Sequence, residues 1–293
     1  MSALILFSTA SLALGQKAKP PAKAPKPIIF AVVNDGTTLE PIAYINRSRL
    51  ENPVGGDSDQ GIISAFAKAY YKTGATYRLV FGGTDAGTVT VKKNNAASEC
   101  SKNTADVTVK SSKVIPKGFV MALATNAVIK NKSAGVRRKP TVAERSEIEA
   151  LVKKEYAKHK ITASVLKSQN LTAIDVNNDG KAEMVGSYWV EVDKFTRDLL
   201  FFIAEKGANG KYAFGIADYR RVEQKDVMSQ SIKDVDDGIY HEMFLDSFDF
   251  DGDATNEIFT HQASFEGAGF TAYQKKAGKW TRLFENSNYH CAY

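Results

Sequence analysis

The sequence predicts an α+β protein that is mostly antiparallel β. Three observations support this fold class. Short β-branched and aromatic runs between turn residues fill 28–130, a helical period occupies 141–159, and an acidic loop followed by an apolar strand occurs twice after residue 165. Short runs bounded by Gly, Asn and Ser are typical of sheets built from hairpins. Hydrophobic residues make up 43% of the 293-residue chain, so we expect a packed core.

Residues 1–15 are predicted to be a signal peptide. The run "MSALILFSTASLALG" is apolar, too short to span a bilayer comfortably, and ends in the small-x-small sequence Ala13-Leu14-Gly15. No Lys or Arg precedes it, so either the start codon is mis-assigned or the signal is atypical. The alternative to a signal peptide is a buried N-terminal strand or helix. After cleavage we expect no transmembrane helix and a secreted or periplasmic protein.

Residues 16–27 form a Lys/Pro-rich linker in this interpretation. Alternating Pro, Lys and Ala in "KAKPPAKAPKP" favour an extended, solvated chain. Its four lysines supply four of the six net positive charges, so the high isoelectric point does not require a basic face. We therefore expect no nucleic-acid partner. Contact of this tract with anionic lipid or cell-wall polymer is the alternative to a plain linker.

Residues 28–130 are predicted to be a β-rich domain with one helix, "GIISAFAKAYYK". The helix is expected to bury a single stripe composed of Ile62, Phe66, Ala69 and Tyr70. A polar segment with Lys, Arg and Pro then leads to an amphipathic connecting helix at 141–159. Thr141 and Glu144 form a capping box at its start. Its apolar stripe is expected to contain Ile148, Leu151, Val152 and Tyr156.

Residues 165–293 are predicted to be a C-terminal β domain of two units, each with an acidic loop, a strand, a turn and a strand. The first aspartates of the two loops, Asp175 and Asp249, are 74 positions apart. A third acidic stretch at 234–242 has Gly at its fifth position, so we expect a turn there. Cys100 and Cys291 form an even pair in an exported chain, which predicts one disulfide; two free thiols are the alternative.

The two acidic loops, "DVNNDGKAE" and "DFDGDATNE", are predicted to bind metal. Both place oxygen-bearing side chains at positions 1, 3, 5 and 9. Carboxylates so close together repel one another unless a cation lies among them. We therefore predict about two Ca²⁺ ions, with position 7 contributing a backbone carbonyl. The predicted ligands are Asp175, Asn177, Asp179, Lys181 and Glu183 in the first loop, and Asp249, Asp251, Asp253, Thr255 and Glu257 in the second.

Three other interpretations of these loops are open. An EF-hand needs a carboxylate at position 12, where the chain has Gly186 and Thr260, and it needs flanking helices. A turn rich in Asp and Asn without any ion is the second alternative, and two copies with Glu at position 9 make it less favourable. Mg²⁺ is the third; it keeps several waters, whereas a loop rich in protein oxygens favours Ca²⁺.

With these residues in view, the two loops resemble the calcium loops of FG-GAP and VCBS-type repeats, the units of integrin-like β-propellers. The resemblance covers about residues 171–290 and implies the position-by-position ligand set given above. A closed propeller needs at least four blades, and the sequence contains two good loops. We therefore expect a compact two-unit antiparallel β domain. Nothing comparable covers the N-terminal half.

The sequence contains no GxSxG, HExxH or P-loop motif. Each of the four histidines is expected to be structural or on the surface. The leading interpretation is an exported, non-enzymatic calcium-binding protein with a recognition or adhesion role toward a glycan or protein. The alternative is an extracytoplasmic hydrolase that uses a carboxylate pair, for which a cleft with paired or pKa-shifted acids away from the loops would be expected.

Overall fold

The structure is a computed structural model that describes residues 25–130, 137–163 and 165–291. The predicted signal peptide and residues 16–24 of the predicted linker lie outside the described residues. All strand pairs in the named sheets are antiparallel, and strands far outnumber helices, which confirms the prediction of a mostly antiparallel β chain.

The first seven strands pair into a ring. The order is β1-β7-β4-β5-β6-β2, and pairing between β1 and β2 closes the ring. The short strand β3 pairs antiparallel with the end of β2. The strands are β1 (Ile28–Val33), β2 (Thr38–Asn46), β3 (Arg49–Glu51), β4 (Thr76–Phe81), β5 (Thr84–Asn94), β6 (Ala105–Ser111) and β7 (Ala122–Thr125). Every residue of β1 is buried because its side chains alternate between the ring's interior and a second sheet outside it.

Helix α1 (Gln60–Tyr70) packs onto the ring interior. Phe66 and Tyr70 are buried as predicted, but Ile62 is 50% exposed and Ala69 is exposed; Ile63 and Ala67 are buried instead. Both stripes have helical spacing and share Phe66 and Tyr70. Packing against the ring decides which of the two stripes is buried, and the local sequence pattern alone does not distinguish them.

The rest of the chain contains two four-stranded meanders. The first has the spatial order β11-β10-β9-β8 and the second β12-β13-β14-β15. Their strands are β8 (Lys167–Ile174), β9 (Glu183–Asp193), β10 (Thr196–Lys206), β11 (Tyr212–Glu223), β12 (Glu242–Phe248), β13 (Glu257–Ala263), β14 (Gly267–Lys276) and β15 (Lys279–Tyr289). A short 3-10 helix η1 (Gln224–Asp226) and helix α3 (Lys233–Asp236) connect the meanders.

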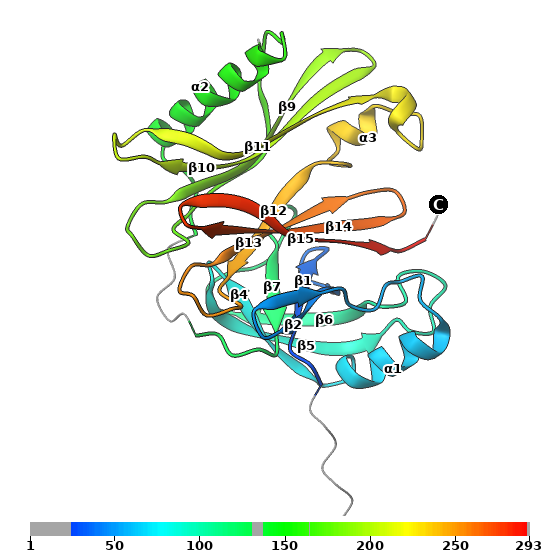
Figure 1. Ribbon diagram of the computed structural model, residues 1–293. Coiled ribbons are helices and arrows are strands. Elements are labelled where there is room, and N and C mark those ends of the chain that lie inside the picture. The colour runs from blue at the N-terminus through cyan, green and yellow to red at the C-terminus, as the bar shows by residue number, and fades with distance from the viewer. Residues whose placement is uncertain (1–24, 131–136, 164, 292–293) are drawn as a thin grey trace, which may run out of the picture.

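The elements stack in layers, as Figure 1 shows: α2, the β8–β11 sheet, the β12–β15 sheet, then the ring with α1. Helix α2 (Val142–Lys158) covers the first meander with Ile148, Val152 and Tyr156, and its capping box is formed as predicted. Alternate residues of β12 face opposite neighbours. Leu245 packs against the ring and Phe244 against the first meander. The second meander is therefore buried on both faces.

Polar bonds also connect the layers. The Arg137 guanidinium lies 2.7 Å from the Asp246 carboxylate, and both side chains are buried. The sulfur atoms of Cys100 and Cys291 lie 2.11 Å apart, at bonding distance, as the sequence predicts.

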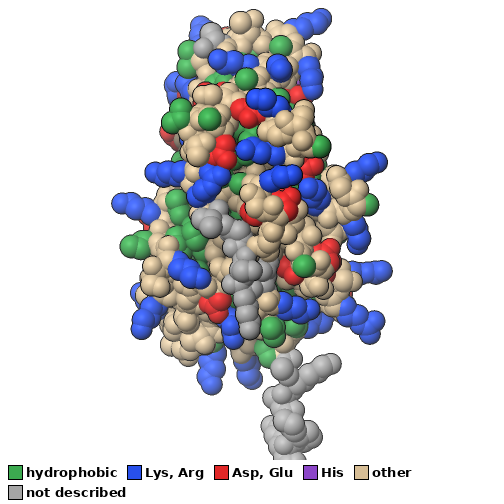
Figure 2. All heavy atoms as spheres, turned by 90° about the vertical axis from the view of Figure 1, so that its left-hand side faces the viewer, with side chains coloured by type: hydrophobic (Ala, Val, Ile, Leu, Met, Phe, Trp, Pro, Cys, Tyr) green, Lys and Arg blue, Asp and Glu red, His purple; other side chains and the backbone are tan. Residues whose placement is uncertain are grey.

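On the face that Figure 2 shows, basic side chains spread over every layer instead of gathering in one patch. None of the helices in the described ranges has the length and apolarity needed to cross a membrane.

Candidate metal loops

Each acidic loop connects the first two strands of its meander. The first acidic loop (residues 175–183) leads from β8 into β9, and the second acidic loop (residues 249–257) leads from β12 into β13. Position 9 of each loop is already the first residue of the following strand. The two units therefore place their acidic loops equivalently. The turns between the later strands differ in length between the two meanders.

The two loops share a pattern of internal hydrogen bonds. In both, the N–H of position 7 donates to the carboxylate of position 5 at 2.8 Å. The N–H of position 6 donates to the carboxylate of position 1, at 2.9 Å in the first loop and 3.2 Å in the second. The N–H of position 2 donates to the glutamate of position 9, at 3.1 and 3.4 Å. Backbone donors of each loop thus bond the carboxylates at positions 1, 5 and 9.

The backbone conformation also repeats. Positions 4 and 6 have positive φ in both loops: Asn178 at 56° and Gly180 at 79°, then Gly252 at 84° and Ala254 at 72°. Left-handed conformations favour Gly, and Asn tolerates them. The glycine occupies position 6 in the first loop and position 4 in the second, yet both loops adopt the same turn. The shape therefore belongs to the nine-residue pattern as a whole.

The glutamates at position 9 are the most buried of the predicted ligands. Glu183 is 3% exposed and Glu257 is 1% exposed. Burial raises the pKa of Glu183 to about 7. Burial, with a further contribution from the charge of Asp251, raises the pKa of Glu257 to about 8. Burial also raises the pKa of Asp249. These carboxylates lack full charge compensation from the described residues.

The second loop brings three predicted ligands together. One carboxylate oxygen each of Asp249, Asp251 and Glu257 lies within 4.8 Å of the others, which makes the only such group of acidic, His or Cys side chains in the described residues. Asp253 is exposed, and its carboxylate accepts the N–H of Thr255. The first loop has no such group among its described side chains, and its position 3 is the uncharged Asn177.

Gln274 on β14 is part of the second loop's surroundings, and sequence reasoning missed it. Its Nε2 donates to Asp251 at 3.3 Å and to Glu257 at 3.2 Å. Strand register places it one residue beyond the Ile258–Tyr273 pair. The polar residue in the apolar run "GFTAYQ" is the only local signal of this contact.

The equivalent place in the first unit carries different charges. Glu205 lies one residue beyond the Met184–Ala204 pair, as Gln274 does in the second unit. Its carboxylate forms an ion pair with Lys275 and accepts the indole N–H of Trp280. Lys275 also acts electrostatically on Glu183, opposing the rise in its pKa. A lysine ammonium therefore lies near the first loop.

The two loops touch each other through the backbone. The N–H of Asn256, at position 8 of the second loop, donates to the carbonyl of Val176, at position 2 of the first, at 2.8 Å. The Asn256 side chain donates to Ser247 Oγ at 3.2 Å and is buried. The candidate sites are therefore neighbours in space, although 74 residues separate them in the chain.

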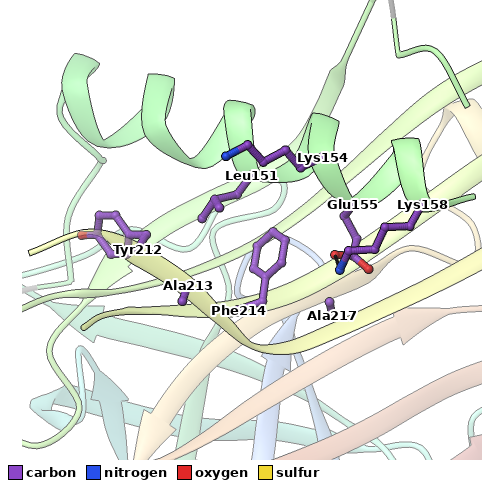
Figure 3. A pocket seen from close by; sticks show the side chains of 8 residues that line it. All are labelled: Leu151, Lys154, Glu155, Lys158, Tyr212, Ala213, Phe214 and Ala217. Carbon is purple, nitrogen blue, oxygen red and sulfur yellow. Dashed lines mark hydrogen bonds and ion pairs between the residues drawn. The ribbon is translucent and has the colours of Figure 1, made fainter. Parts of the chain in front are cut away.

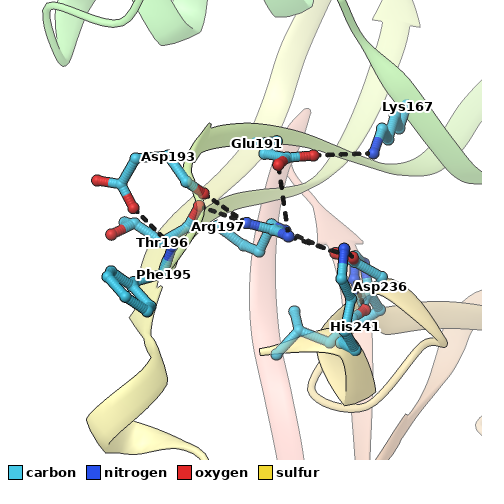
Figure 4. A network of polar contacts seen from close by, with 10 residues as sticks. Lys167, Glu191, Asp193, Phe195, Thr196, Arg197, Asp236 and His241 are labelled. Atoms are coloured by element: carbon cyan, nitrogen blue, oxygen red, sulfur yellow. Dashed lines mark hydrogen bonds and ion pairs between the residues drawn. The ribbon is translucent and has the colours of Figure 1, made fainter. Parts of the chain in front are cut away.

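The third acidic stretch, residues 234–242, contains a short helix followed by a turn. Its acids have separate partners: Asp234 accepts Ser229 Oγ, and Glu242 accepts the hydroxyls of Thr260 and Tyr273. Asp236 is paired with Arg197, a fully buried residue that lies 2.6 Å away and also donates to the carbonyls of Asp193 and Thr196 (Figure 4). This network fastens α3 to the β9–β10 hairpin instead of forming a third loop.

One cleft outside the two loops is lined by a pair of acids. It lies between the meanders, is lined in part by Asp218, Arg220 and Glu242, and has a volume of about 60 Å³. Burial raises the pKa of Glu242. Asp218 is ion-paired with Arg282 at 2.7 Å. The cleft therefore combines a shifted acid with a second carboxylate, but it is far smaller than the roughly 300–1,000 Å³ of typical ligand sites.

Comparisons of this chain with models of protein families, with curated proteins and with solved structures found no match.

Proposed function

We propose that this chain is an exported calcium-binding protein whose two acidic loops each hold one Ca²⁺ ion. Its role is recognition or adhesion toward a glycan or protein, without catalysis. The observation that carries the calcium part is the repeated geometry of the loops: the same hydrogen bonds and the same two left-handed positions recur although the glycine has moved. The same loop conformation in two different sequences favours the same function for both loops.

The donor set suits a hard cation. Side chains at positions 1, 3, 5 and 9 offer oxygen atoms only, and Ca²⁺ takes six to eight oxygen ligands in an adaptable geometry. The buried carboxylates of Glu183 and Glu257 have raised pKa values, so a nearby cation would favour their ionised form. When bound, the ion supplies the charge compensation that the described side chains do not.

The two loops should differ in affinity. Three acidic side chains already converge in the second loop, and Gln274 holds two of them. The first loop has Asn177 in place of an acid, and Lys275 acts on Glu183. Fewer negative ligands weaken cation binding. A lysine ammonium does not distinguish the loops, because Lys275 lies near the first and Lys130 lies beside Gly252 in the second. We therefore expect the second loop to fill first as calcium rises.

Export is supported by the cysteine pair, because disulfides persist mainly in oxidising compartments. The resemblance to calcium-loop repeats supports the same assignment. The alternative function, a hydrolase with a carboxylate pair, would place its acids at Glu242 and Asp218. The small volume of that cleft does not favour it, because a polymer substrate would need a larger opening.

Calorimetric titration with Ca²⁺, combined with thermal unfolding in about 1 mM Ca²⁺ and in EDTA, tests this proposal. A site with a Kd near 10 μM would add roughly 2.7 kcal/mol, which corresponds to several degrees in Tm. We expect two ions for the unmodified protein and one ion each for Asp179→Asn and Asp251→Asn. Asp237→Asn, an exposed acid outside both loops, serves as the control.

An identical Tm in Ca²⁺ and EDTA, together with no heat of binding, would refute the calcium part. Loss of binding in the Asp237→Asn control to the same degree as in the loop variants would show diffuse charge attraction instead of two defined sites.

A further inference from the structure

Strand β11 forms an open edge of the first meander. Within the described chain it pairs with β10 alone, so the backbone groups along its other side have no strand partner. At its start, the N–H of Tyr212 is satisfied by Glu147 of α2 at 2.8 Å. Unpaired strand edges attract other extended chains because their N–H and C=O groups remain available for pairing. The strand spans twelve residues, which is long for an edge left uncovered.

A groove runs beside this edge, between α2 and the first half of β11. Its volume is about 420 Å³. Figure 3 shows Leu151 and Phe214 pointing into the space between the helix and the strand, with Lys154 and Lys158 along the helix side. Ala213 and Ala217 on the strand are small and exposed, so they leave the groove open. An apolar floor thus lies next to a row of unpaired backbone groups.

The charge of the groove selects its occupant. Lys158 is ion-paired with Glu155, whereas Lys154 is exposed and forms no ion pair with any described residue. Lys154, Glu155 and Lys158 leave one net positive charge in the lining. The Glu147 carboxylate is already engaged by the N–H of Tyr212. Lys154 therefore favours an acidic side chain of a partner. The chain's own N-terminal tract is a poor candidate: it is rich in lysine, which this lining repels, and its prolines lack the N–H that strand pairing needs.

We propose that α2 and β11 form a docking site for an extended, acidic peptide segment of another protein. The segment pairs its backbone with the free edge of β11, places an apolar side chain against Leu151 and Phe214, and sets an acidic side chain near Lys154. Addition of a strand beside a helix is an established mode of peptide recognition. This inference rests on the recognition part of the proposed function and does not depend on the calcium part.

The test uses a fluorescein-labelled peptide of about ten residues in which Glu and Val alternate around one central Phe. Binding to the full chain is measured by fluorescence anisotropy, with and without EDTA. Two matched peptides serve as probes of mechanism: one carries N-methyl groups at alternate amides, and one replaces every Glu by Lys. We expect the acidic peptide to bind, and both altered peptides to bind at least about tenfold more weakly.

Two charge reversals on α2 provide the matched protein variants. Lys154→Glu changes the groove, whereas Lys153→Glu changes an exposed lysine of the same helix that does not line it. Losing one exposed ion pair and introducing a repulsion of similar size should weaken binding about fivefold in Lys154→Glu. Lys153→Glu should bind as the unmodified protein does. Hydrogen exchange of the β11 amides should slow when the peptide is present.

Several outcomes would overturn the inference. No binding of the acidic peptide up to about 1 mM would do so. Equal binding of the N-methylated peptide would exclude strand pairing, and equal weakening by both lysine variants would reduce the effect to general charge attraction. Sedimentation showing a dimer that Ala217→Arg disrupts would identify a second copy of the chain as the occupant. Binding that persists in EDTA keeps this inference intact even if the loops hold no ion.

Discussion

The buried pair Arg137–Asp246 is expected to hold the ring and the second meander together, and Asp246→Asn tests this. Asp246 on β12 is fully buried and accepts the N–H groups of Gly82 and Gly83, which follow β4, at 3.0 Å each. Arg137 donates to it at 2.7 Å and also to the carbonyls of Met121 and Leu245. Its guanidinium lies over the Phe81 and Phe244 rings, at 4.3 and 4.7 Å. One ion pair thus connects three segments.

The loss of stability expected for Asp246→Asn follows from the burial of this ion pair. Asparagine keeps the volume and one acceptor oxygen but removes the charge, which leaves the guanidinium buried without its counter-ion. Breaking a buried pair in this way costs about 3–5 kcal/mol. At roughly 2–4 °C per kcal/mol for a chain of this size, Tm should fall by about 6–20 °C. The assay is thermal unfolding followed by circular dichroism at neutral pH.

The control is Asp218→Asn, which breaks the ion pair with Arg282. Both of those side chains are more than 40% exposed, so the change should cost no more than about 1 kcal/mol. A fall in Tm for Asp246→Asn no larger than that of the control would refute the reasoning. Two separate unfolding transitions in the unmodified protein would also contradict the expectation that the layers unfold together.

Two further predictions concern other single residues. His241 is fully buried beside the Val235 carbonyl at 2.9 Å, and burial lowers its pKa from 6.5 to about 4, so the unfolded chain binds a proton that the folded one does not. Stability should therefore be complete above pH 6.5 and fall by about 3 kcal/mol as pH drops to 4, and urea unfolding of His241→Gln should lack this part of the pH dependence. In the loops, Ala254→Gly should raise stability by about 1 kcal/mol because φ there is 72°, and Gly180→Ala should lower it by a similar amount because φ there is 79°. Chemical denaturation in EDTA measures both changes, and a change of stability in the same direction for the two substitutions would contradict this account.

The sequence predicted best what depends on neighbours in the chain. The capping box of Thr141 and Glu144 lies within one helical turn, so its residues alone specify it. The acidic loops are similar, because their hydrogen bonds connect residues at most seven positions apart. Local patterns of this kind carry their own geometry: the capping box is formed as predicted, and the two loops adopt the same turn. Metal binding by the loops stays a prediction.

Long-range features were beyond reach of the sequence. The sequence pattern does not predict strand β12, because its run "EMFLDSF" contains Asp246 and Ser247 among apolar residues. The partners that satisfy Asp246 lie more than one hundred positions earlier in the chain. Closure of the ring through β1 and β2, and the choice of Ile63 over Ile62 as the buried side of α1, also depend on contacts between distant segments.

If each loop holds an ion, the backbone bond between Asn256 and Val176 is expected to link the two binding events. Val176 accepts this bond with its carbonyl while its N–H holds Glu183. An ion that orders the second loop therefore also fixes the residue that positions a carboxylate of the first, and part of the ordering entropy is already spent when the second ion arrives. Linkage makes this effect reciprocal, so each ion should strengthen the other by the same factor. The chain would then respond to calcium more steeply than the same two sites would without this link.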